Sequence, residues 1–168
     1  MKDTNNEYMG AEGYSLMSAS FEVHRELGGG LSEDVARQRV DGKPKVCPEL
    51  SGGRLERVPF GRLKAQIYQE SLELELGLRD IDFSSKAELA VFYKGHQLNK
   101  RYVPDLLVSA EIVTELKAVK CLTHDHEQQL LNYMHITKKA VGYLINFGPP
   151  SVEWKRFILK EYILSDQK

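Results

Sequence analysis

The chain has 168 residues, of which 42% are hydrophobic and 28% charged, and its formal net charge is −1. These values predict one globular domain, and they exclude a disordered chain and a protein whose whole surface is basic. The polar start lacks the basic and apolar parts of a signal peptide, and no apolar run approaches the ~20 residues that span a bilayer. We therefore expect a cytoplasmic protein without a membrane segment.

The first predicted helix follows a disordered tail at residues 1–12. Apolar residues recur on one helical face between Tyr14 and Leu27. The glycines at 28–30 favour a helix end there, because glycine adopts positive φ at little cost. From residue 13 to residue 164 we expect a single domain.

A basic insertion is predicted within this domain, at about residues 35–64. The stretch holds three prolines and eight basic residues against three acidic ones, and it shows little sustained periodicity. Loops of this length are uncommon inside compact domains. A basic segment of this kind is expected either to contact a nucleic-acid backbone or to be a solvated loop.

The remaining elements alternate between helix and strand. Periodicity predicts a helix from Ala65 to about Gly77, and then an extended region from Ile81 to Tyr93 with a turn at Lys94 and Gly95. We expect later strands at 102–108, 112–119, 139–147 and 153–164, and a helix at 126–136. This order predicts an α/β or α+β fold, with one central mixed sheet flanked by helices.

Two carboxylates and an ammonium group are expected to meet at one edge of the sheet. In a hairpin whose tip is 109–111, Asp105 lies opposite Glu115, with Cβ atoms roughly 5 Å apart, and Lys117 shares the face of Glu115. Carboxylate oxygens, completed by waters and a phosphate, suit Mg²⁺ or Mn²⁺. Lys117 would then orient a metal-bound water or stabilise charge on the phosphate. A solvated ion pair without chemistry is the alternative.

Seven segments in the same order along the chain carry a resemblance to a known family: Phe21–Leu31, Ile67–Leu76, Val91–Gly95, Pro104–Val108, Glu115–Ala118, His126–Tyr133 and Val141–Phe147. They resemble the bacterial GxxExxY proteins, a branch of the PD-(D/E)XK nuclease-like superfamily. The resemblance implies a restriction-endonuclease-like αβββαβ core, with Asp105, Glu115 and Lys117 in the place of the D…ExK active site. Gln129 and Tyr133 are similar to the QxxxY motif of exonuclease-type relatives, and we expect them to contact substrate or brace the site.

The motif that gives the family its name is divided in this chain. Residues 30–33 match its GxxE half and Tyr68 matches its tyrosine, with about thirty residues between them. Glu33 is expected to assist catalysis if it reaches the site across the insertion, and Tyr68 is expected on the substrate-binding side. The alternative is that the helical glutamate of the family is lost here.

These residues together predict a nuclease that hydrolyses phosphodiesters with Mg²⁺ or Mn²⁺, with DNA favoured over RNA by analogy. Asp105, Glu115 and the backbone carbonyl of Leu116 are the expected metal ligands, and Lys117 positions the attacking water. Nucleic acid is the expected partner, and the chain is expected to act as a monomer or a homodimer. The alternative function is a protein of the same fold that binds nucleic acid or protein without catalysis.

Overall fold

Two long helices begin the computed structural model, which describes residues 9–29 and 60–163. Helix α2 spans Gly10–Leu27 and helix α3 spans Phe60–Leu78. Helix α2 begins four residues before the predicted Tyr14 and ends, as predicted, at a glycine, because Gly28 adopts a φ of 77°. Helix α3 begins at Phe60, so residues 60–64 of the stretch predicted as an insertion are helical.

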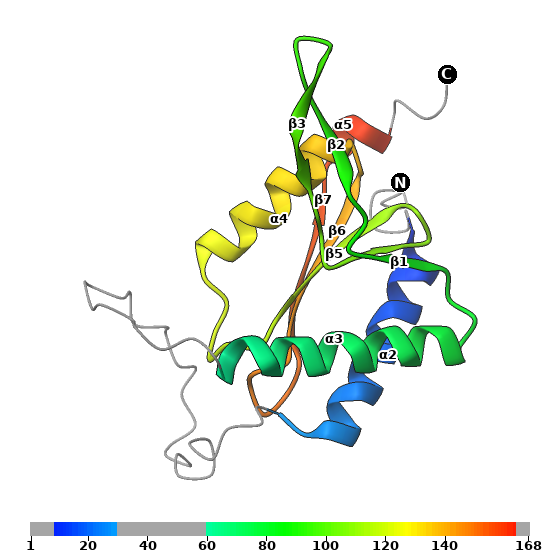
Figure 1. The fold of residues 1–168 in the computed structure, drawn as a ribbon. Helices are drawn as coiled ribbons and strands as arrows, with labels where there is room; N and C mark the ends of the chain where they lie inside the picture. The colour runs from blue at the N-terminus through cyan, green and yellow to red at the C-terminus, as the bar shows by residue number, and fades with distance from the viewer. Residues whose placement is uncertain (1–8, 30–59, 164–168) are drawn as a thin grey trace.

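Five strands form one mixed sheet in the order β1-β4-β5-β6-β7 (Figure 1). The strands are β1 (Phe83–Ser85), β4 (Leu106–Val108), β5 (Ile112–Lys117), β6 (Val141–Asn146) and β7 (Glu153–Ile158). Strands β5 and β6 are parallel, and the other neighbouring pairs are antiparallel. A parallel pair needs a long crossover, which helix α4 (His124–Thr137) supplies here.

A separate two-stranded sheet consists of β2 (Leu89–Tyr93) and β3 (His96–Tyr102). The two strands turn at Lys94 and Gly95 as predicted, and both turn residues have positive φ, which matches a two-residue hairpin. The prediction of one strand over 102–108 is wrong. Pro104 lies between β3 and β4 and has no N–H to donate to a ladder, so the chain changes sheets there.

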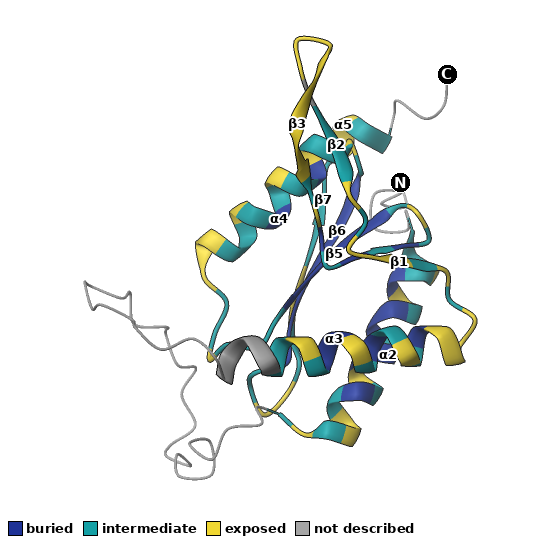
Figure 2. Cartoon of the chain, in the orientation of Figure 1, coloured by how far each residue is buried: buried dark blue, intermediate teal, exposed yellow. Residues whose placement is uncertain are grey.

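Helices cover both faces of the main sheet (Figures 1 and 2). On one face, α2 and α3 pack residues such as Leu16 and Leu72 against Leu106. On the other face, Met134 of α4 packs against Leu144 of β6. Strand β6 is buried along its whole length between these layers, which explains why its sequence is an apolar run and not an alternating one.

The end of the described chain departs from the prediction. Strand β7 stops at Ile158, and a short helix, α5 (Lys160–Ile163), replaces the last part of the strand that was predicted over 153–164. Within residues 9–29 and 60–163, no helix combines the length and the apolar character needed to cross a membrane.

Candidate active site

The hairpin of β4 and β5 brings two carboxylates together at one end of the main sheet. Asp105 directly precedes β4, and the register of the hairpin places it opposite Glu115 of β5. The Oδ2 atom of Asp105 accepts a hydrogen bond of 2.8 Å from the backbone N–H of Leu116, which holds this carboxylate against β5. The hairpin turns at 109–111, as the sequence predicts.

Burial makes both carboxylates costly to ionise. Glu115 is 2% exposed, and burial raises its pKa from the ordinary 4.5 to about 7. The Asp105 carboxylate adds to this rise in pKa, whereas Lys117 opposes it. Burial also raises the pKa of Asp105. A bound cation would compensate both negative charges, so the electrostatics of the pair fit a metal site.

The donor set of this pair fits a hard divalent cation. The hydrogen bonds of this pair converge on one oxygen of each carboxylate, because Oδ2 of Asp105 accepts from Leu116, and Oε2 of Glu115 accepts from Lys117 and Gln129. Leu116 directs its N–H toward Asp105, and its carbonyl points to the same side of the strand. Among the described residues, no group of three or more His, Cys, Asp or Glu side chains could hold a metal ion. A cation here would therefore complete its shell with water or phosphate oxygens.

A hydrogen-bond network joins α4 to the end of β5. The Nζ atom of Lys117 donates to Glu115 Oε2 at 3.2 Å and to Gln129 Oε1 at 3.0 Å. Gln129 in turn donates from Nε2 to Glu115 Oε2 at 3.2 Å and to the hydroxyl of Tyr133 at 3.0 Å. Gln129 and Tyr133 lie four residues apart on one helix face, as the sequence predicts. The structure thus joins these four predicted site residues in one network, and it places Asp105 and Leu116 beside them.

Two residues of α3 that are not among the predicted site residues also approach Asp105. The Nε2 atom of Gln69 donates to Glu73 Oε1 at 2.9 Å and lies 3.5 Å from the backbone oxygen of Asp105. The Glu73 carboxylate contributes to the raised pKa of Asp105 after burial, the main cause. Both residues line a polar hollow of about 150 Å³ between α3 and the end of β1. Their spacing of four, beside the buried stripe of Tyr68 and Leu72, is the signal that could have identified them.

Of the two halves of the divided motif, the structure describes only the one that contains Tyr68. Glu33 lies outside the described residues. Tyr68 has no exposed surface; its ring stacks on Phe147 with centroids 4.8 Å apart, and its hydroxyl donates to the backbone oxygen of Gly28 at 2.8 Å. A side chain without exposed surface does not offer a substrate contact, so the expected binding role of Tyr68 is replaced by a structural one.

Asn146 at the end of β6 fixes the chain just beyond Lys117. Its side chain is fully buried, and its Oδ1 atom accepts hydrogen bonds from the N–H groups of Val119 at 3.0 Å and Gly148 at 3.1 Å. Its Nδ2 atom donates to Glu153 at 3.1 Å. From the sequence, Asn146 is predicted only as part of the buried strand at 139–147.

We expect Asn146→Ala to lower the free energy of unfolding by about 2–3 kcal/mol, because two buried N–H groups lose their acceptor. Urea unfolding followed by circular dichroism measures the change. Glu153→Gln is the matched control, since its amide oxygen can still accept the hydrogen bond from Asn146, and we expect it to cost less than about 1 kcal/mol. An unchanged unfolding midpoint in Asn146→Ala would contradict the structural role of this side chain.

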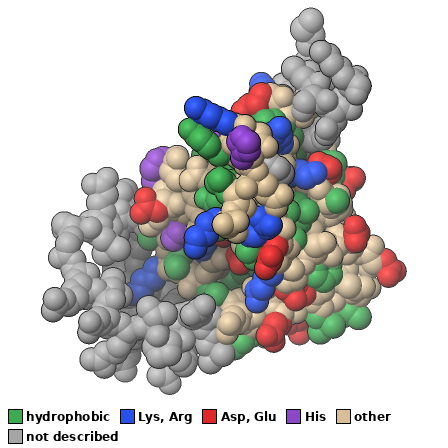
Figure 3. All heavy atoms as spheres, turned by 45° about the horizontal axis from the view of Figure 1, so that its top comes forward, with side chains coloured by type: hydrophobic (Ala, Val, Ile, Leu, Met, Phe, Trp, Pro, Cys, Tyr) green, Lys and Arg blue, Asp and Glu red, His purple; other side chains and the backbone are tan. Residues whose placement is uncertain are grey.

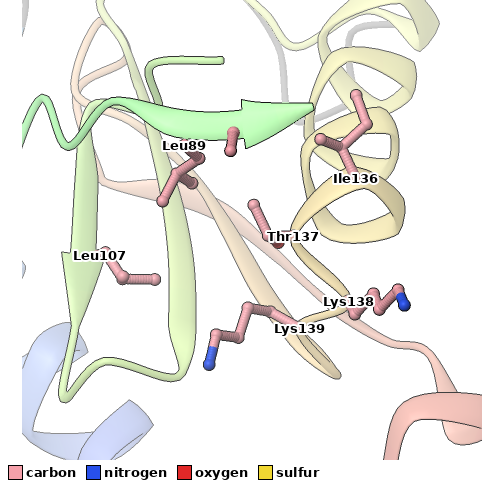
Figure 4. Close-up of a pocket in the computed structure, with 7 residues that line it drawn as sticks. Leu89, Leu107, Ile136, Thr137, Lys138 and Lys139 are labelled. Carbon is pink, nitrogen blue, oxygen red and sulfur yellow. The ribbon is translucent and has the colours of Figure 1, made fainter. Parts of the chain in front are cut away.

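A larger cavity, of about 310 Å³, lies away from the carboxylates at the base of the β2–β3 hairpin (Figure 4). Leu89, Leu107 and Ile136 give it apolar walls, and Lys138 and Lys139 lie at its lower side in the figure. None of its lining residues belongs to the predicted site. The cavity is therefore distinct from the candidate active site, and its larger volume does not make it the active site.

Comparisons with known proteins found one family and two solved structures that resemble this chain. The family described as the PD-(D/E)XK nuclease superfamily matches residues 57–157, which is more than half of the chain. The structure titled "Crystal structure of SSO0001" is 18% identical with a TM-score of 0.47, and the match covers 64% of this chain and 61% of that one. An alkaline exonuclease (LHK-Exo) from Laribacter hongkongensis is 9% identical with a TM-score of 0.45, over 66% of this chain and 64% of that one.

The chain thus spans less than two thirds of the length of either structure. At this level of similarity, neither structure supports a conclusion about this chain. No curated protein matches the chain.

Proposed function

We propose, from the premise that this chain belongs to the PD-(D/E)XK nuclease superfamily, that it is a metal-dependent phosphodiester hydrolase acting on nucleic acid. The order α3, β1, β4, β5, α4, β6 follows the αβββαβ core, so the predicted fold class is confirmed. The observation that carries the proposal is the buried pair of Asp105 and Glu115 with Lys117 hydrogen-bonded to it. DNA is proposed over RNA by analogy with the superfamily.

Mg²⁺ or Mn²⁺ is the proposed metal, held by Asp105, Glu115 and the carbonyl of Leu116. Bound there, it would polarise the scissile phosphate and activate a water. The protein supplies two negative charges that are unfavourable without the cation, which fits the raised pKa of Glu115. The buried position of Glu115 also keeps bulk water away from one side of the metal site.

Lys117 is the proposed group that positions the attacking water or stabilises charge on the phosphate. Its ammonium lies between Glu115 and Gln129, so its direction is set by two acceptors. Gln129 acts through Lys117 and Glu115 and is a positioning residue. Tyr133 braces Gln129 with its hydroxyl.

Cleavage assays test this function directly. Single- and double-stranded DNA and RNA are incubated with the protein in Mg²⁺, Mn²⁺ or EDTA. Cleavage that requires the metal supports the proposal, and a faster reaction on DNA than on RNA supports the substrate preference. Retained binding with no cleavage of any substrate would contradict it.

A binding module without catalysis is the second candidate. It is favoured by the absence, among the described residues, of a third carboxylate grouped with Asp105 and Glu115. Glu33, the residue that the divided motif offers for this place, lies outside the described ranges. The same assay separates the two candidates, because a binding module retains affinity for nucleic acid in every metal condition and cleaves nothing.

For the hydrolase, we expect Gln129→Ala to lower kcat by about 10- to 100-fold, because Lys117 loses one of the two acceptors that direct it. Steady-state kinetics on an oligonucleotide measures kcat and KM separately, and KM is expected to change less. Gln128→Ala is the matched control, since Gln128 is exposed on the same helix. Equal kcat values for the two variants would show that Gln129 does not position the reacting groups.

Kinship with the GxxExxY proteins, with the motif divided between residues 30–33 and Tyr68, is part of the same proposal. We also propose a cytoplasmic location, which localisation of a tagged chain in cells tests. Sedimentation equilibrium decides between the monomer and the homodimer.

A further inference from the structure

The β2–β3 hairpin projects from the body of the molecule (Figures 1 and 2). All residues from 93 to 101 are exposed, so this part of the hairpin contributes nothing to the hydrophobic core. The hairpin contributes no strand to the main sheet, in which β1 pairs directly with β4. Ordering such a segment costs conformational entropy, and little buried surface offsets this cost. We therefore expect the hairpin to serve in binding.

The exposed part of the hairpin is basic. Lys94, Lys100 and Arg101 lie on it, and there is no acidic residue between positions 89 and 104. None of the three forms an ion pair with a described residue, whereas five other basic side chains each do: Arg25, Arg79, Lys117, Lys139 and Lys155. Figure 3 brings this end of the molecule forward and shows Lys, Arg and His side chains gathered on it. The charge of the hairpin is therefore available to an anionic partner.

The hairpin leads directly to the candidate active site. Tyr102 at the end of β3 packs edge-on against Tyr133 of α4, with ring centroids 4.7 Å apart. Tyr133 accepts a hydrogen bond from Gln129, which contacts both Lys117 and Glu115. Along the chain, Tyr102 also lies only three residues before Asp105. A ligand bound along the hairpin would thus extend into the site.

An aromatic ring stands beside these cations. Tyr93 is 61% exposed, and the Nζ atom of Lys94 lies 5.5 Å from the centre of its ring. Tyr93 pairs with His96 directly at the turn, so these two side chains share one face of the ribbon there. An exposed ring next to phosphate-binding cations suits stacking on an unpaired base.

We propose that the β2–β3 hairpin is an arm that binds single-stranded nucleic acid and leads it into the site. Lys94, Lys100 and Arg101 contact backbone phosphates, and Tyr93 stacks on a base. This inference rests on the proposed function for the direction of the strand, because it places the scissile phosphate at Asp105 and Glu115. Binding by the arm itself requires neither metal nor cleavage.

Fluorescence anisotropy in EDTA, with a labelled single-stranded oligonucleotide at several salt concentrations, tests the charge of the arm. For the triple variant Lys94→Ala, Lys100→Ala, Arg101→Ala, we expect the slope of log affinity against log salt to fall by about 2, and affinity at 0.1 M salt to fall about 100-fold. The matched control is Arg25→Ala, Arg79→Ala, Lys155→Ala, which removes the same charge elsewhere. Equal losses in the two triple variants would overturn the assignment of binding to the hairpin.

Tyr93→Ala and Tyr93→Phe test the stacking. We expect the alanine variant to bind the single strand about 5- to 100-fold more weakly, the phenylalanine variant to bind it as the wild type does, and neither to change binding of a duplex. Tighter binding of the duplex than of the single strand by the wild-type protein would overturn the single-strand assignment. A shift of the triple variant from dimer to monomer in sedimentation, without loss of nucleic-acid affinity, would instead identify a second copy of the chain as the occupant.

Cleavage of a small phosphodiester, bis(p-nitrophenyl) phosphate, distinguishes failure of this inference from failure of the proposed function. The triple variant is expected to hydrolyse it as fast as the wild type, because so small a molecule does not reach the arm. A wild-type protein that binds oligonucleotides through the arm but hydrolyses nothing supports the arm and contradicts the hydrolase. A wild-type protein that cleaves, with a triple variant that binds and cleaves oligonucleotides equally well, supports the hydrolase and overturns the arm.

Discussion

Asp105→Asn is expected to reduce metal-dependent cleavage by about 1,000-fold or more. The neutral amide no longer compensates the charge of the cation, and loss of the metal removes several kcal/mol of transition-state stabilisation, with each ~1.4 kcal/mol worth tenfold in rate. Asparagine retains an oxygen that can accept the hydrogen bond from the N–H of Leu116, so the hairpin of β4 and β5 should stay folded. Cleavage of labelled DNA over time measures the rate, and urea unfolding confirms that the variant is folded.

Two further variants locate the effect. Asp82→Ala removes an exposed carboxylate just before β1 and is expected to leave the rate unchanged. Lys117→Ala should lose about 100-fold in rate while it still binds Mg²⁺, because the lysine acts on the water or phosphate and not on the metal. Isothermal titration with Mg²⁺ separates these cases. A folded Asp105→Asn variant that cleaves at the wild-type rate would show that the chemistry does not use this carboxylate.

The β4–β5 hairpin is predictable because local rules determine it. The turn at 109–111 and the two-residue period of strands together fix which side chains face one another, so the opposition of Asp105 and Glu115 follows from the sequence alone. Likewise, a spacing of four residues is enough to place Gln129 and Tyr133 on one helix face. The main fold follows from the same kinds of pattern, together with the resemblance.

Three other features depend on how elements far apart in the sequence pack together, so no local sequence pattern predicts them: strand β3, the approach of Glu73 to Asp105 and the burial of Tyr68. Strand β3 is polar and exposed along nearly all of its length, so no alternation of apolar residues indicates it. Glu73 approaches Asp105 only because α3 crosses the sheet at that end. The Tyr68 hydroxyl donates to the backbone oxygen of a residue 40 positions away in the sequence, and this contact satisfies the hydroxyl of a side chain that lies in the core.

The structural role of Asn146 also could not be predicted from the local sequence. A polar residue inside an apolar run is compatible with a buried strand. Its position in the sequence does not indicate which backbone segments its side chain will hydrogen-bond. Its three hydrogen bonds link the segment after β5 with the segment after β6, two parts of the chain that become neighbours only when the parallel pair forms. The site is thus held by contacts that arise from the topology.

Glu115→Gln is expected to stabilise the metal-free protein at alkaline pH while it abolishes metal binding. Since the folded pKa of Glu115 is about 7 against an ordinary 4.5, the folded state holds a proton between these values that the unfolded chain has released. Stability from this group is therefore fully present below pH 4.5 and is lost as pH rises through 7, for a total of about 3 kcal/mol. Glutamine does not ionise, so the variant should lack this loss and be more stable than the wild type by about 3 kcal/mol at pH 8.

Urea unfolding between pH 4.5 and 8 measures the difference, first in EDTA and then in millimolar Mg²⁺. In EDTA the wild-type curve should fall toward pH 8 more steeply than that of Glu115→Gln, and the two proteins should converge near pH 4.5. Because a ligand that binds only the folded state stabilises it, Mg²⁺ should recover stability in the wild type at pH 8 and leave the variant unchanged. Parallel pH curves in EDTA would contradict the buried, high-pKa state of Glu115. A steeper fall of the wild type in EDTA and its recovery in Mg²⁺ would together show that the Glu115 carboxylate destabilises the fold whenever no cation is bound. Such a residue contributes to metal binding and not to stability.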